Sequence, residues 1–181
     1  TVQKNLRVAD EKLKSGCEST AKMLEDAGMT TLVFSDDFDS IYTVDTQNTA
    51  KEGYKWYVDR PYGAKTLTTE DYSVKNGIMT LHNIKPTYNY GLGTYNHNTK
   101  VGFSYNTGYM EIRFRIPRPR ENEGSEKGVP AIWALPPDKL TNRSTHWVEV
   151  DWLEYWGNNY YTICLHEQKK DTYQKQIVLL D

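Results

Sequence analysis

The sequence predicts an all-β fold of the sandwich type, preceded by a short N-terminal helix. The chain has 181 residues, which suits one domain with a single core. From Thr31 onward, short runs of β-branched and aromatic residues recur at intervals of about ten residues, separated by Gly, Asn, Asp and Pro. Aromatic residues make up 13% of the chain. Such flat amphipathic side chains suit packing between sheets and also stacking on sugars.

Residues 1–30 differ from the rest and are expected to form an N-terminal helical segment or linker. Their apolar residues fall loosely at helical spacing, namely Leu13, Cys17, Leu24 and Ala27. Gly28 is a stop signal for that helix. The segment either packs on the surface of the domain or ends a linker to another domain. Residues 31–181 then form the β domain.

The β domain contains ten expected strands, separated by turn-forming residues. They are residues 31–34, 55–58, 72–74, 78–82, 100–105, 108–116, 131–135, 146–155, 160–167 and 177–180. The sequence Lys75-Asn76-Gly77 predicts a β-hairpin between two of them, because Asn-Gly is a strong signal for a two-residue turn. Residues 118–128 are rich in Arg, Glu, Asn and Gly and are expected to form an exposed loop.

Charge, hydropathy and cysteine content exclude several classes of partner. The 22 basic and 24 acidic residues leave a net charge of -2, so we expect no nucleic-acid partner. The longest aliphatic runs have about four residues, far fewer than the roughly 20 that a membrane-spanning helix needs, so we expect no membrane insertion. Cys17 and Cys164 allow at most one internal disulfide, and the sequence leaves its formation open.

The densest group of ionisable residues lies in the expected strand at 146–155, where Glu149, Asp151 and Glu154 place three carboxylates within six positions. Alternation along a strand puts Glu149 and Asp151 on one face but turns Glu154 to the opposite, apolar face. One extra residue, a β-bulge at 152–153, returns Glu154 to the acidic face. Because bulges recur beside active sites, this spacing indicates a functional site.

Glycoside hydrolysis gives a physical reason for three mutually repelling carboxylates on one strand. In a retaining mechanism one carboxylate attacks the anomeric carbon and a second, protonated one donates to the leaving oxygen, at a separation of roughly 5–5.5 Å. The Cα atoms of Glu149 and Glu154 are expected about 13 Å apart, and their long side chains can lean together on a concave sheet. Asp151 lies between them, so the three groups should titrate together and set which glutamate holds the proton.

The motif Glu149-x-Asp151-x-x-Glu154 resembles the catalytic signature of glycoside hydrolase family 16 in its bulged, laminarinase- or agarase-like form. Further segments follow that family's order: residues 32–38, 72–81, 108–117 and 130–136 resemble its first strand, its early hairpin, its Gly-Tyr-x-Glu-x-Arg strand and its Trp-Pro-Ala-x-Trp strand. The chain departs from the pattern at Val129, where the family usually has Trp. The resemblance covers about residues 32 to 167.

This resemblance implies a concanavalin-like jelly roll of two antiparallel sheets with a glycan-binding cleft. It implies Glu149 as the nucleophile, Glu154 as the general acid/base and Asp151 as the assisting carboxylate. Trp133 matches the second Trp of the family's Trp-Pro-Ala-x-Trp strand, which implies a sugar-stacking platform. Trp147 shares the parity of Glu149 and is a second candidate platform. Packing in the core is the alternative role for both tryptophans.

The implied activity is endo-acting, retaining hydrolysis of a β-linked polysaccharide, either a β-1,3-glucan or an agar-type galactan, outside the cell or at its surface and without a cofactor. A non-catalytic glycan-binding module on the same scaffold is the alternative. Binding-only relatives typically lose one or both glutamates, whereas all three carboxylates are present here. The family domain is usually longer than this chain, so we expect an incomplete domain whose unpaired sheet edge favours association.

The sequence predicts no metal site at the histidines, because His146 and His166 lack further ligands at the regular spacing that zinc sites show. Asp36, Asp37 and Asp39 form an acidic group that suits either a structural calcium ion or a turn cap. The turn cap is the favoured interpretation.

Overall fold

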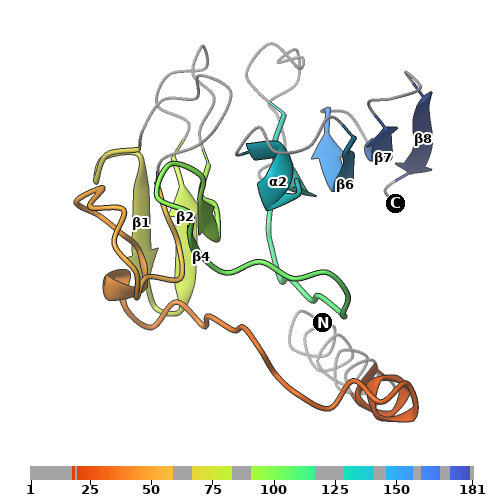
Figure 1. The fold of residues 1–181 in the computed structure, drawn as a ribbon, viewed down its shortest axis with the longest axis horizontal. Helices are drawn as coiled ribbons and strands as arrows, with labels where there is room; N and C mark the ends of the chain where they lie inside the picture. Colours follow the sequence, from red (N-terminus) through yellow and green to blue (C-terminus); the bar gives the residue numbers. More distant parts are fainter. Residues whose placement is uncertain are drawn as a thin grey trace, which may run out of the picture. The chain divides into compact units, whose positions relative to one another are not determined.

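The computed structural model describes residues 18, 20–58, 67–82, 91–116, 129–140, 146–156, 160–167 and 172–179. The chain divides into two compact units, one made of Thr1–Ser35 with Tyr105–Arg113 and the other of Asp36–Ser104 with Phe114–Asp181. Among the described residues, the strands pair antiparallel in three sheets and the helices are short (Figure 1). At this level the predicted all-β class is confirmed.

The first unit contains the predicted N-terminal helix, described over residues 20–26. Two backbone hydrogen bonds close its C-terminal end. The Gly28 N–H donates to the Glu25 carbonyl at 2.9 Å, and the Met29 N–H donates to the Leu24 carbonyl at 2.8 Å. This pair of bonds is the Schellman pattern, which satisfies carbonyls that the last helical turn leaves without partners. The helix therefore ends where the sequence predicts.

In the second unit, β1 (Tyr72–Lys75) and β2 (Ile78–Leu81) form the predicted hairpin. Asn76 and Gly77 both have positive φ, 53° and 70°. Two consecutive positive φ values define a type I′ turn, whose twist matches that of the paired strands. The Asn-Gly prediction is confirmed. A second, shorter pair consists of β3 (Tyr95–Asn96) and β4 (Val101–Gly102).

The core of this part of the chain is a small apolar cluster. Its buried members are Val44, Val58, Leu67 and Tyr72, and Ile41, Trp56, Met79 and Leu92 pack against them. The 3-10 helix η1 (Ile41–Thr43) leads into the cluster and is capped by Ser40, whose hydroxyl accepts from the Tyr42 N–H. The cluster therefore joins the hairpin to the segments that precede it in the chain.

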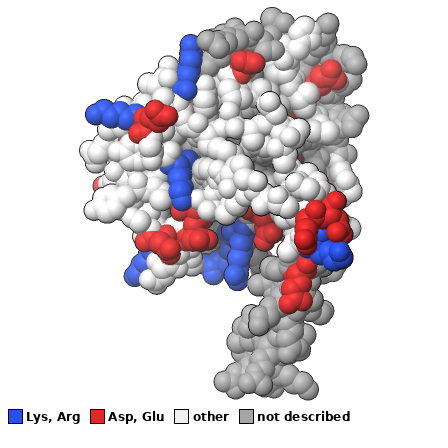
Figure 2. Space-filling view, turned by 60° about the horizontal axis from the view of Figure 1, so that its bottom comes forward, with Lys and Arg blue, Asp and Glu red and all other residues white. Residues whose placement is uncertain are grey.

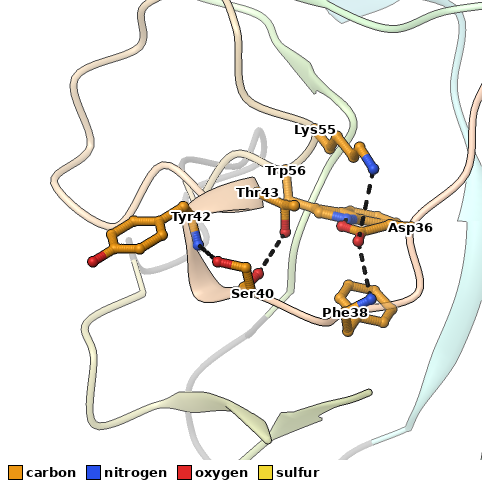
Figure 3. A network of polar contacts seen from close by, with 7 residues as sticks. All are labelled: Asp36, Phe38, Ser40, Tyr42, Thr43, Lys55 and Trp56. Atoms are coloured by element: carbon orange, nitrogen blue, oxygen red, sulfur yellow. Dashed lines mark hydrogen bonds and ion pairs between the residues drawn. The ribbon is translucent and has the colours of Figure 1, made fainter. Parts of the chain in front are cut away.

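Asp36 organises the turn that precedes this core (Figure 3). Its carboxylate accepts from the Phe38 N–H at 3.0 Å and from Trp56 Nε1 at 2.8 Å, and Lys55 Nζ lies 3.8 Å away. The Phe38 ring stacks on the Trp56 ring, with centroids 5.7 Å apart. The turn-cap interpretation of Asp36 is confirmed, since both carboxylate oxygens meet protein donors.

The largest sheet has four antiparallel strands in the order β5-β6-β7-β8. They are β5 (Ala131–Ala134), β6 (Val148–Tyr155), β7 (Tyr160–Glu167) and β8 (Thr172–Leu179). A short helix, α2 (Pro137–Leu140), follows β5. The sequence predicts β5, β6 and β7 with nearly these bounds, because their β-branched and aromatic residues occur in runs, but the expected strand at 177–180 covers only the end of β8.

Three other predicted strands are wrong. Residues 31–34 and 108–116 form no strand, and 55–58 contains only single bridges, from Trp56 to Val44 and from Tyr57 to Gly93. The first two segments carry large apolar side chains that stay exposed, among them Leu32, Val33, Ile112 and Phe114. Strand propensity reflects packing on a half-buried sheet. It therefore predicts a strand wrongly where no neighbouring strand provides hydrogen-bond partners.

Charged side chains of both signs lie among one another on the face drawn in Figure 2, as expected from the small net charge of -2. None of the described helices has both the length and the apolar character needed to cross a membrane.

Candidate active site

A β-bulge in β6 determines which side chains share a face of the four-stranded sheet. Asp151 is paired with Cys164 of β7, and the next registered pair is Glu154 with Thr162. Three steps along β6 therefore match two steps along β7. The register with β5 shows the same extra residue, since Trp133 pairs with Asp151 and the preceding Ile132 with Leu153. The bulge predicted at 152–153 is confirmed.

The bulge places all three carboxylates on one face. Side chains of directly opposed residues point to the same side of a sheet. Glu149 pairs with His166, Asp151 with Cys164, and Glu154 with Thr162. The three partners alternate along β7, so they too share one face. We call these six residues the acidic face. With strict alternation, Glu154 would instead have joined the apolar side.

The opposite face of β6 anchors the sheet. Leu153 and Tyr155 are buried, at 6% and 7% exposure, and Val150 is half-buried. Their burial fixes the register of β6, since a slip by one residue would exchange the two faces. Apolar contacts on one side therefore hold the acidic residues on the other.

Asp151 is the most enclosed of the three acids, with 3% of its surface exposed. Nε2 of His166 lies 3.0 Å from its Oδ2 atom. Burying a carboxylate is unfavourable unless it is paired, and the imidazole of His166 is the partner at this distance. His166 itself keeps 38% of its side chain exposed, so its ring reaches solvent as well as Asp151.

Glu154 is held by two neighbours from β7. Sγ of Cys164 lies 3.1 Å and Oγ1 of Thr162 lies 3.3 Å from the same carboxylate oxygen, Oε2. Thr162 in turn accepts from Nε1 of Trp156 at 3.1 Å. Cys164 and Thr162 are fully buried, and Cys164 forms no disulfide with another described residue. This network holds one oxygen of Glu154, Oε2, in place.

Mutual repulsion and burial shift the titration of the site. Burial raises the pKa of Glu149, the charge of Asp151 raises it further, and His166 acts in the opposite direction. Burial also raises the pKa of Asp151, with Glu154 adding to the increase and His166 opposing it. Glu149 and Asp151 thus each respond to the charge of a neighbouring acid, so the protonation of either depends on the charges around it.

The two predicted tryptophan platforms lie in different surroundings. Trp133 of β5 is half-buried and directly opposite Asp151, so it belongs to the acidic face. Trp147 precedes β6, is also half-buried, and lines a hollow of about 360 Å³. The other residues around this hollow are Pro136, His146, Val148 and Glu167. Only Trp133 is placed beside the carboxylates by the strand register.

Strand β7 contributes polar side chains to the site that the motif in β6 does not indicate. Asp151, Cys164 and His166 each offer one ligand atom, and these atoms all lie within 4.8 Å of one another. The alternating pattern Thr162-x-Cys164-x-His166 is the signal in the sequence, because it places three polar side chains on one face of the strand after the acidic motif. Spacing along a single strand does not reveal a ligand set shared by two strands.

Comparisons with protein-family models, with curated proteins and with solved structures give no match. The functional assignment therefore rests on the residues and the geometry of the acidic face.

Proposed function

We propose that this chain is an endo-acting, retaining glycoside hydrolase of the family 16 type that cleaves a β-1,3-glucan or an agar-type galactan. The observation that carries the proposal is the bulge in β6, which puts Glu149, Asp151 and Glu154 on the same face. A retaining glycosidase needs two carboxylates on one surface, one as nucleophile and one as acid. The carboxylates repel one another beside the buried Asp151, which gives no advantage to a sheet that needs only to be soluble.

In the proposed reaction, Glu149 attacks the anomeric carbon and forms a glycosyl ester, while Glu154 protonates the departing glycosidic oxygen. Glu154 then removes a proton from water, and that water cleaves the ester with net retention. Among the described residues, Thr162 and Cys164 donate to Glu154, and both contact Oε2. Its transferable proton is therefore assigned to Oε1.

Asp151 is proposed to assist from between the two glutamates. Its raised pKa means that it holds a proton more readily than an ordinary aspartate. A protonated Asp151 can donate to Glu149 and stabilise its carboxylate before the attack. His166, 3.0 Å from Asp151, limits this tendency when it is itself charged.

Sugar binding is assigned to Trp133, whose position opposite Asp151 supports stacking of a pyranose ring beside the acids. Trp147 is proposed as a second sugar platform, and it lines a hollow together with Val148 and Glu167, a pair that the register puts on the other face of the sheet from the acids. The proposed scaffold is a jelly roll in which β5 to β8 form part of one sheet, and the proposed location is outside the cell or at its surface, where such polymers occur. Association with another chain at an unpaired sheet edge would complete the scaffold.

Release of reducing ends from laminarin, mixed-linkage glucan, agarose, porphyran and carrageenan tests the proposal. The variants are Glu149→Gln, which removes the nucleophile, and Glu52→Gln, which removes an equal charge from an exposed turn. Activity in the wild type and in Glu52→Gln, but not in Glu149→Gln, supports the hydrolase. Polymer binding in a glycan-loaded gel without any product identifies a binding module instead.

A further inference from the structure

The acidic face contains a second set of groups, which the hydrolytic mechanism does not require. Asp151, Cys164 and His166 supply a carboxylate oxygen, a thiol sulfur and an imidazole nitrogen whose ligand atoms lie within 4.8 Å of one another. We propose that these three side chains form an inhibitory zinc site, in which one Zn²⁺ ion bridges β6 and β7.

The geometry suits a tetrahedral ion. Bonds of about 2.0–2.3 Å place the ligand atoms of tetrahedral zinc roughly 3.2–3.8 Å from one another. Nε2 of His166 and Oδ2 of Asp151 are already 3.0 Å apart, and no pair in the set exceeds 4.8 Å. Small changes in the side-chain rotamers would bring the three ligand atoms to the distances that zinc requires. The fourth position is open to water or to Glu154, whose Oε2 lies 3.1 Å from Sγ of Cys164.

Asp151 gives an independent indication of a ligand. Its Oδ2 atom is buried and lies 3.0 Å from Nε2 of His166, in an arrangement that falls outside good hydrogen-bond geometry. A buried carboxylate oxygen without a directed donor is unfavourable, and a bound cation relieves it. Asp151 and Cys164 are buried whereas His166 is partly exposed, so an ion would approach the site from the side of the His166 ring.

The donor set selects the metal. A thiolate with an imidazole suits Zn²⁺, whereas Ca²⁺ and Mg²⁺ prefer oxygen ligands alone. Binding replaces the thiol proton of Cys164 with a sulfur–zinc bond and releases that proton to solvent. The thiolate can no longer donate to Glu154, and the carboxylate of Asp151 is engaged by the metal. Inhibition of hydrolysis by zinc follows from these two changes, and this part rests on the proposed function.

The metal site is tested without substrate, on chelator-treated protein. Titration with Co²⁺ should give a thiolate-to-cobalt absorption band at one ion per chain, and calorimetry with Zn²⁺ should give the same stoichiometry. Cys164→Ser should abolish the band and weaken Zn²⁺ binding by at least about tenfold. Cys17→Ser, which changes the other cysteine of the chain, should leave both unchanged. Excess Ca²⁺ or Mg²⁺ should not displace the ion.

His166→Gln is a second test in case Cys164→Ser does not fold, because the side chain of His166 is partly exposed. With unchanged circular dichroism, it should also weaken Zn²⁺ binding by at least about tenfold. A folded wild type without the cobalt band, or a band that survives in Cys164→Ser, would overturn the zinc site. Zinc binding in a protein without hydrolytic activity refutes the proposed function and leaves the site standing. If added Zn²⁺ does not reduce the rate of hydrolysis, the proposed inhibition is refuted.

Discussion

Asp151 and Cys164 are direct partners across β6 and β7, yet the next pair, Glu154 and Thr162, is three residues further along one strand and two residues back along the other. This mismatch is what makes the acidic face. Without it, Glu154 would point away from Asp151 and could not reach the hydroxyl of Thr162. The bulge thus connects a local irregularity of the backbone to the side-chain arrangement on which the proposed chemistry depends.

Glu154→Gln should lower the rate on natural polymer by about 10²–10⁴, because the leaving oxygen then departs without a proton. An aryl glycoside with an acidic phenol as leaving group needs little protonation, so its rate of glycosylation should change far less. Initial rates on both substrates measure the difference. Equal losses on the polymer and on the aryl glycoside would contradict the acid role.

Much of this fold could be predicted because its signals are local. The Asn76-Gly77 turn and the end of the first helix at Gly28 each depend on a few adjacent residues. The bulge at 152–153 could also be predicted, because three acids cannot share a face without it. The contacts of His166 and Cys164 depend on the register between two strands, which alternation within either strand leaves open.

Thr162→Val should destabilise the protein by about 1–2 kcal/mol. The substitution keeps the shape of a fully buried side chain but removes the oxygen that accepts from Trp156 and contacts Glu154. Thr162→Ser is the matched control, since it keeps the hydroxyl and loses only a methyl group. Urea unfolding of both variants gives the comparison. Thr162→Val as stable as the wild type would show that the hydrogen bonds contribute nothing net.

Gly102→Ala should destabilise the protein by at least about 2 kcal/mol more than Gly53→Ala. Both glycines have φ in the left-handed region, 115° and 108°, so the backbone strain is matched. A Cβ at Gly102 would collide with the Thr94 carbonyl and lie 2.9 Å from the Tyr57 ring, whereas one at Gly53 meets nothing within 4 Å. Thermal unfolding of the two variants separates the clash from the strain, and similar losses would mean that β3 and β4 can move apart.

The coupled carboxylates should make the protein less stable as the pH rises from about 4 towards neutrality. The folded state raises the pKa of Asp151 and of Glu149, so it binds more protons than the unfolded chain between the ordinary carboxyl pKa and the raised one. Stability is lost across that window, and the full penalty is present above the raised pKa.

Asp151→Asn removes an acid that burial and Glu154 disfavour in its charged form, so the variant should have the higher Tm at neutral pH and lose its advantage in acid. Calorimetric Tm values across the range, with Glu52→Gln as the exposed control, decide the sign. A wild type that gains stability over the same interval, relative to Asp151→Asn, would show that the charge of His166 outweighs burial.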